Sequence, residues 1–111
     1  MNIDRIFAAL ADPVRMALCE LMAKHDGSLC VDELIMRINE RFERDLAQST
    51  ISAHLRILRN AGLVDYRKKG LWAYYHFEQA TFNQALSLAR LRLASGTIRH
   101  NNEDLHVMAA R

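Results

Sequence analysis

The fold of this chain is decided by residues 48–64, QSTISAHLRILRNAGLV, together with the segment that follows them at 65–77, DYRKKGLWAYYHF. In the first segment apolar residues recur at helical spacing, and Gly62 stands where a helix would end. The second segment is rich in Val, Tyr, Trp and Phe and contains Gly70, which suits a tight turn. The pattern predicts a short helix from about residue 49 to 60 and a hairpin with strands near 63–67 and 71–77.

The flanking sequence predicts four further helices. One lies near residues 2–10, and a second begins at Asp12-Pro13, an N-cap followed by proline, and ends before Gly27. A short extended piece at 28–30 leads into a third helix, whose apolar face begins at Val31 and can continue to Phe42 and Leu46. The fifth helix is expected from Thr81 to Gly96. Its apolar positions are Phe82, Ala85, Leu86, Leu88, Ala89, Leu91 and Leu93.

These elements predict one mainly α-helical domain of order α-α-α-α-β-β-α, a winged helix-turn-helix, at residues 1–96. Residues 97–111 are polar and are expected to form a loose tail. The apolar surface of the fifth helix is wider than a small core requires. With the first helix, it predicts a homodimer contact, whereas burial in the protein's own core is the simpler alternative.

Basic residues are concentrated in one part of the chain. Residues 41–70 hold seven Lys and Arg against three Asp and Glu, whereas the remainder holds eight against ten. Nucleic-acid binding predicts such an asymmetry, although a solvated charged face would produce it too.

The start of the predicted helix at 49–60 carries polar side chains that suit the edges of DNA bases, and small Ala53 permits close approach. The alternative for Ser49 and Thr50 is that they cap the helix, although capping would explain only one of the two hydroxyls. The alternative for His54, taken alone, is a structural role. The candidate contacts of this helix are Gln48, Ser49, Thr50, Ser52, Ala53, His54 and Arg56. Three cations at the predicted hairpin tip, Arg67, Lys68 and Lys69, are expected to contact phosphates, the alternative being a solubility cluster.

Four segments of the chain resemble the ArsR/SmtB family of bacterial repressors, and together they cover about residues 6–77. They are residues 8–15, AALADPVR; residues 29–34, LCVDEL; residues 48–64; and residues 67–75, RKKGLWAYY. The chain departs from the family between Leu34 and Gln48, where it is several residues longer. The arginines of this extended link, Arg41 and Arg44, are expected either to add phosphate contacts or to lie on a lengthened third helix.

The resemblance implies a homodimeric winged helix that binds an inverted-repeat operator in double-stranded DNA and blocks transcription. In many family members an inducer, often a metal ion or metalloid, releases the DNA. Two familiar family metal sites are incomplete here. The thiolate motif reads Cys30-Val31-Asp32, and the fifth-helix zinc motif retains only His100 and Glu103. No cofactor and no metal ligand are therefore assigned, although a metal inducer stays open.

The two cysteines offer a second kind of sensor. Cys30 lies at the expected start of the third helix, where a thiol is activated, and Cys19 lies on the preceding helix. Oxidation or persulfide chemistry that links the two would shift the helices that position the DNA-reading segment. The alternative is that Cys19 is a small buried apolar residue and Cys30 an inert cap.

The leading function from sequence is a DNA-binding transcriptional repressor, and the alternative is a winged-helix module for protein interaction. A nucleophile–base pair, a complete metal triad and a glycine-rich phosphate loop are not recognisable, so an enzyme is not expected. The chain lacks an apolar run long enough for a bilayer and begins without a signal-peptide pattern, so we expect a cytoplasmic protein without membrane contact.

Overall fold

The structure is a computed structural model that describes the backbone of residues 1–99 and the side chains of residues 1–94. The chain order agrees with the sequence prediction, with one additional strand. The elements are α1 (Ile3–Leu10), α2 (Pro13–His25), β1 (Leu29–Cys30), α3 (Val31–Phe42), α4 (Gln48–Asn60), β2 (Val64–Lys69), β3 (Trp72–Phe77) and α5 (Gln79–Arg99).

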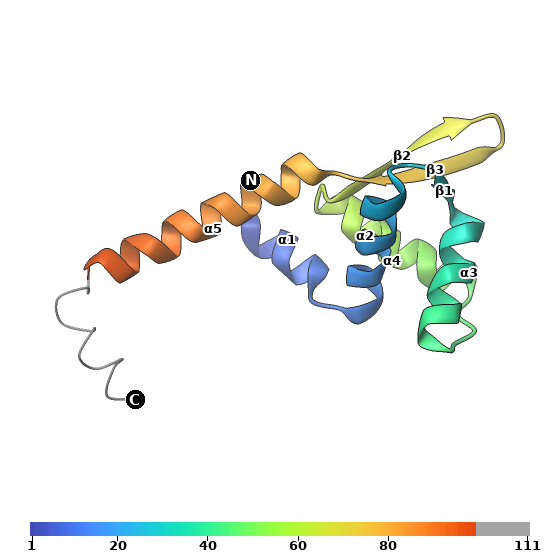
Figure 1. The fold of residues 1–111 in the computed structure, drawn as a ribbon, viewed down its shortest axis with the longest axis horizontal. Coiled ribbons are helices and arrows are strands. Elements are labelled where there is room, and N and C mark those ends of the chain that lie inside the picture. The colour runs from blue at the N-terminus through green and yellow to red at the C-terminus, as the bar shows by residue number, and fades with distance from the viewer. Residues whose placement is uncertain (100–111) are drawn as a thin grey trace.

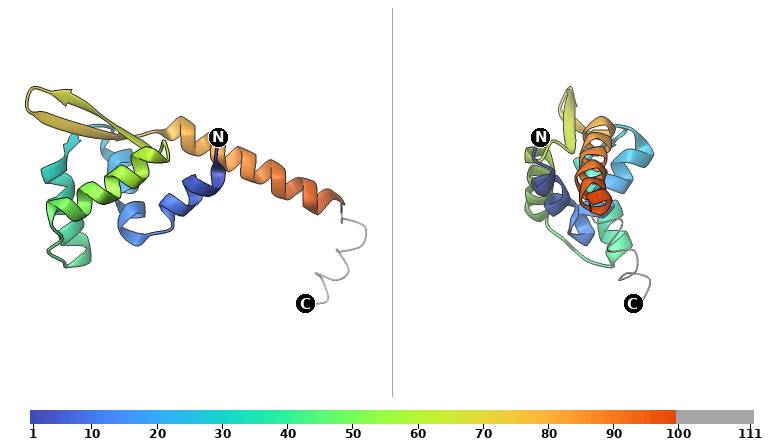
Figure 2. Two further views of the ribbon diagram at one scale, coloured as in Figure 1. Left: turned by 180° about the vertical axis from the view of Figure 1, so that it is seen from behind. Right: turned by 90° about the vertical axis from the view of Figure 1, so that its left-hand side faces the viewer.

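The helices α1 to α4 pack around a single core, the β2–β3 hairpin projects from one side, and α5 leaves on the opposite side (Figure 1). The fully buried side chains include Leu18, Leu34, Ile51 and Leu58, one or more from each of α2, α3 and α4. Because α5 extends away from this core, the molecule measures 59 × 28 × 21 Å, and the view from behind shows the same projection (Figure 2, left).

The expected extended piece at 28–30 forms a third strand rather than a simple connection. β1 pairs antiparallel with β3, Leu29 opposite Tyr75 and Cys30 opposite Tyr74, which gives the strand order β1-β3-β2. A two-residue strand is too short for periodicity to reveal. Its pairing ties the start of α3 to the base of the hairpin.

The hairpin and the last helix differ in their bounds from the prediction. Arg67, Lys68 and Lys69 belong to strand β2, and the turn consists of Gly70, with φ of +62°, and Leu71. The fifth helix, expected to stop at Gly96, continues to Arg99, because one glycine costs a long helix only about 1 kcal/mol. The expected tail at 97–111 thus begins inside α5, and its other residues lie outside the described part of the chain.

The link before α4, which the sequence predicts to be extended, is held in place by hydrogen bonds. α3 continues to Phe42. The Asn39 side chain then makes two hydrogen bonds to the link: it donates to the Leu46 carbonyl at 3.2 Å and accepts from the Leu46 N–H at 2.8 Å. Arg41 lies on α3 and forms an ion pair with Glu20 of α2 at 2.9 Å. The insertion therefore lengthens α3, and of its two arginines only Arg44 lies in the link.

Candidate nucleic-acid interface

The outward face of α4 combines polar side chains with small Ala53, and the exposed Ile57 lies beside it. Ile51, Leu55 and Leu58 are buried, so the residues on the opposite side of the helix face solvent. Helical periodicity aligns Ser49, Ala53 and Arg56 on this side, and all three are exposed. Small Ala53 lies between a hydroxyl and a guanidinium, so another surface can approach the helix backbone closely at this point.

The amino terminus of α4 lacks a capping side chain. The N-cap residue is Ala47, which accepts from the N–H groups of Thr50 and Ile51 through its carbonyl but has no side-chain acceptor. The capping alternative for Ser49 and Thr50 is therefore wrong, because both already lie inside the helix. Exposed Gln48, Ser49 and Thr50 surround first-turn amides, which form an electropositive end suited to a phosphate.

One flank of α4 turns towards α2, and His54 lies on it. His54 is half-buried, and its Nδ1 is 3.3 Å from Nη1 of Arg15 on α2. Because a guanidinium can only donate, Nδ1 must accept, and the ring proton is placed on Nε2. Arg15 in turn donates through Nε to the Ala9 carbonyl at 2.7 Å. The contact joins the end of α1, the first turn of α2 and the middle of α4.

The first turn of α2 is held by Asp12, whose carboxylate accepts from the N–H groups of Val14 at 2.9 Å and Arg15 at 3.0 Å. Partial burial raises the pKa of Asp12, but the hydrogen bond from Arg15, the nearby charges of Arg15 and His54 and the bond from Val14 outweigh it and lower that pKa overall. The negative charge of Asp12 is therefore retained beside Arg15.

The other flank of α4 faces the hairpin, and the two surfaces enclose a cleft of about 340 Å³. Half-buried Ser52 and exposed Arg56 line it from α4, and Lys68 lines it from β2. The three predicted hairpin cations do not share one side. Arg67 and Lys69 line a second cavity, on the other face of the hairpin. The strand alternation separates these neighbours in sequence.

The candidate sensor cysteines are both buried and unbridged. Burial, with a smaller contribution from Glu20, raises the pKa of the Cys19 thiol to about 12, so Cys19 is a poor nucleophile at neutral pH. Cys30 is the N-cap of α3 and forms a capping box with Glu33, whose carboxylate accepts from the Cys30 N–H at 3.2 Å. Hydrogen bonds from the backbone and side chain of Cys30 lower the pKa of Glu33.

A metal site is not visible in the part of the chain that the structure describes: residues 1–99 hold no group of three or more His, Cys, Asp or Glu side chains arranged to bind an ion. His100, Glu103 and His106 lie outside that part. No helix within it is both long and apolar enough to traverse a bilayer.

Sequence reasoning missed two arginines that the structure places at this interface. Arg15 was part of a family motif, but its contact with His54 joins residues 39 positions apart and leaves no local pattern. Arg59 lies in the cleft beside Lys68, and its guanidinium is 4.4 Å above the Tyr66 ring. Its spacing of three and seven residues from Arg56 and Ser52 was the available signal.

Comparison with known proteins gives consistent results. The model of the bacterial regulatory protein arsR family matches residues 12–66. An uncharacterized helix-turn-helix-type transcriptional regulator of Methanocaldococcus jannaschii is 36% identical over 83 residues, which cover 75% of this chain and 85% of the relative. The arsenical resistance operon repressor of Bacillus subtilis is 37% identical over 84 residues, which cover 76% of this chain and 73% of that protein.

Solved structures share the fold. An ArsR-like transcriptional regulator from Rhodococcus sp. RHA1 superimposes with a TM-score of 0.72 at 21% identity, covering 95% of this chain and 91% of the other. The homodimeric winged helix-turn-helix DNA-binding domain of a possible ArsR-family regulator from Mycobacterium bovis gives a TM-score of 0.60 at 22% identity, covering 89% and 82%. The arrangement in Figure 1, with α4 packed beside the projecting β2–β3 hairpin, is thus a winged helix.

Proposed function

Because this chain belongs to the ArsR family of bacterial regulatory proteins, and is therefore a DNA-binding transcriptional regulator rather than an enzyme, we propose that it is a cytoplasmic, homodimeric repressor of an inverted-repeat operator. The observation that carries the proposal is the outward strip of α4, with Ser49, Ala53 and Arg56 exposed beside a basic hairpin. A strip of donors and acceptors around a small residue suits the major groove, where base edges carry a distinct pattern for each base pair.

We assign different parts of the interface to different parts of the DNA. The exposed first turn of α4, at 48–50, and the outward strip contact base edges and the adjacent phosphate. Ser52 and Lys68 face the strand between α4 and the hairpin, whereas Arg67 and Lys69 face the far strand of the minor groove. The separation of the hairpin cations onto two faces supports this assignment. His54 is proposed to donate to DNA through Nε2, with its ring oriented by the Arg15 contact at Nδ1.

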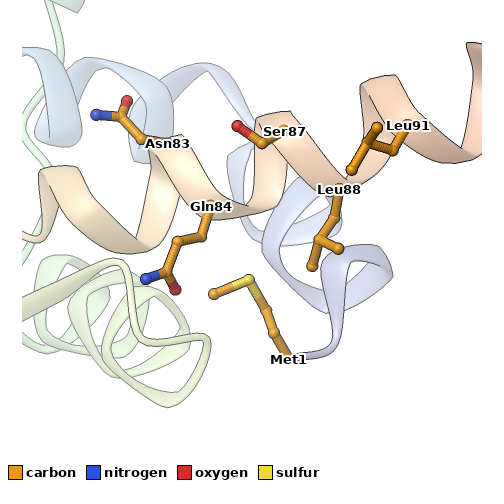
Figure 3. Close-up of a pocket in the computed structure, with 6 residues that line it drawn as sticks. All are labelled: Met1, Asn83, Gln84, Ser87, Leu88 and Leu91. Atoms are coloured by element: carbon orange, nitrogen blue, oxygen red, sulfur yellow. The ribbon is translucent and has the colours of Figure 1, made fainter.

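The dimer is proposed to form through α1 and α5. Leu86 and Leu88 are each 40% exposed, and Leu91 and Leu93 are exposed further along the same helix. Met1 and Leu88 point into a shared cavity of about 420 Å³ between the start of α1 and α5 (Figure 3). An exposed apolar surface on a projecting helix supports a contact with a second copy, and the Mycobacterium bovis neighbour is a homodimer.

The test is DNA binding to the promoter region beside the protein's own gene, followed by footprinting. We expect two protected half-sites with two-fold symmetry. The Ser49→Ala and Ala53→Gln variants are expected to lose preference for this operator over random DNA, because they change the strip that faces base edges. Arg90→Gln on α5 is the control and is expected to retain the preference. Equal affinity of the wild-type protein for operator and random DNA would contradict specific repression.

The same assay addresses the inducer. The protein is tested in reduced form, after oxidation or persulfide treatment, and with zinc, cadmium or arsenite. Release of DNA by thiol treatment that is reversed by reductant, and abolished by Cys30→Ser, supports a cysteine switch. Release only with a metal assigns the inducer to a metal site.

A further inference from the structure

The cleft between α4 and the hairpin is a built, positively charged site. Its polar lining comprises Ser52, Arg56 and Arg59 from α4 and Tyr66, Lys68 and Tyr75 from the hairpin. Three of these side chains are cationic, and no carboxylate lines the cavity of about 340 Å³. This helix–wing cleft therefore offers several hydrogen-bond donors to an anion.

One of the cations is held in place before any ligand arrives. Nε of Arg59 lies 3.4 Å from the Asp65 carboxylate, and the guanidinium lies 4.4 Å above the Tyr66 ring. The same Asp65 oxygen accepts from the Tyr66 N–H at 2.8 Å, which fixes the carboxylate. The ion pair uses Nε, which leaves the two terminal nitrogens of Arg59 to donate to another acceptor. A guanidinium fixed in this way loses little side-chain freedom when it binds.

The position of the cleft indicates which anion it meets, provided that the proposed function holds. The outward strip of α4 would lie in the major groove, and the hairpin would lie along the neighbouring minor groove. The strand that separates the two grooves must then pass between helix and hairpin, directly over the cleft. We propose that the helix–wing cleft binds one phosphodiester group of this strand, with Arg59 as the preset contact and Arg56 and Lys68 completing the donor set.

The donor chemistry matches a phosphate better than a base edge. Guanidinium groups bind phosphate oxygens through paired hydrogen bonds, and an ammonium adds a point charge. Tyr75 presents a neutral hydroxyl, since burial and the neighbouring Tyr66 raise its pKa. A base edge would also require acceptors, and the lining is rich in donors. The cleft would therefore fix the register of α4 on the DNA without reading sequence.

The experiment combines DNA with single neutral phosphates and a variant of the preset contact. Each phosphate of the footprinted operator is replaced in turn by a methylphosphonate, and affinity is measured for wild-type protein and Arg59→Gln across a range of salt concentrations. For Arg59→Gln we expect roughly a tenfold loss of affinity for unmodified DNA. The salt slope should fall by about 1.8, because the proposed dimer loses two symmetry-related phosphate contacts. Lys24→Gln, which removes one exposed positive charge from the end of α2, is the matched control.

The decisive result is non-additivity. Neutralising one symmetry-related pair of phosphates should lower the DNA affinity of the wild-type protein and of Lys24→Gln to the same extent. The same change should not lower the affinity of Arg59→Gln any further. Arg59→Lys should restore part of the affinity. Circular dichroism verifies the fold of each variant.

The outcomes that overturn the proposal differ from those that overturn DNA binding. Wild-type protein that binds no DNA contradicts the proposed function itself. A second outcome contradicts the cleft assignment alone. In it, wild-type protein binds the operator, but the loss of binding free energy caused by Arg59→Gln adds to the loss caused by every methylphosphonate. A third outcome comes from an NMR titration with inorganic phosphate. If phosphate shifts the Arg59 and Tyr66 resonances and operator DNA does not displace it, the cleft binds a free anion and the proposal is overturned.

Discussion

Replacing Arg15 with methionine is expected to destabilise the folded protein, because Arg15 is the only side chain described here that bonds to both α1 and α4. The substitution keeps an unbranched aliphatic stem, two atoms shorter than arginine, and removes all of the donors. It leaves the Ala9 carbonyl, in a residue only 3% exposed near the end of α1, without the 2.7 Å bond that it accepts. It also removes the longer contact of 3.3 Å with His54.

The magnitude follows from these two contacts. An unsatisfied buried carbonyl costs about 1–3 kcal/mol, and the longer bond to His54 adds less. We therefore expect a loss of about 2–3 kcal/mol in the free energy of unfolding, which is a large part of the stability of a small domain. For a chain of this size the corresponding fall in Tm is roughly 10 °C or more.

The assay is urea unfolding followed by far-ultraviolet circular dichroism, with all variants at one protomer concentration. Arg15→Lys keeps the charge and one donor group, and is expected to lose less stability than Arg15→Met. Nitrogen-15 spectra of the His54 ring should report the Nε2–H tautomer in the wild type and a mixture of tautomers in Arg15→Met. A change below about 0.5 kcal/mol, which is within the range of an ordinary surface substitution, would refute the reasoning.

Three further predictions concern other parts of the molecule. The pKa of Asp12 is lowered by folding, so its charge stabilises the protein above the ordinary value of 3.8, and this contribution is lost as the pH falls through the lowered value. Asp12→Asn keeps a good N-cap, so its deficit relative to wild type should be present at pH 7 and should shrink in acid, as measured by urea unfolding at each pH. Cys19, with a pKa raised to about 12, should resist iodoacetamide at pH 7.5 until the protein unfolds, as peptide mass spectrometry will show; rapid labelling of the native protein would contradict its assigned burial. Leu88→Glu should convert the proposed dimer to monomer and weaken operator binding while leaving the helical spectrum unchanged, with sedimentation velocity as the measurement; a dimer that persists would place the interface elsewhere.

The sequence was sufficient for the order of the helices and for the buried and exposed sides of α4, because those signals are local. Asp12-Pro13 defines the start of α2 by capping, and the spacing of Ile51, Leu55 and Leu58 defines the buried side of α4. β1 was not predicted as a strand, because two residues carry no period and depend on β3 for their hydrogen bonds.

The sequence predicts the candidate interface by residue type, and the structure adds the direction in which its side chains point. Lys68 and Lys69 are adjacent in sequence and were expected to act together, yet strand alternation turns them to opposite faces. His54 and Thr50 share a flank of α4 as expected, but only the folded chain brings Arg15 to that flank. Contacts between distant segments depend on how helices pack, and that information is not present in the local pattern.

The exposed leucines of α5 also affect how the regulator would respond to its own abundance. In the proposed dimer, the species that binds DNA forms from two chains, so at low expression its amount rises with the square of the chain concentration. Operator occupancy would then change more steeply than the level of the protein itself. A cell could then pass from an unoccupied to an occupied promoter over a narrow range of gene expression, with each chain of the proposed dimer contributing its own α4 to the DNA.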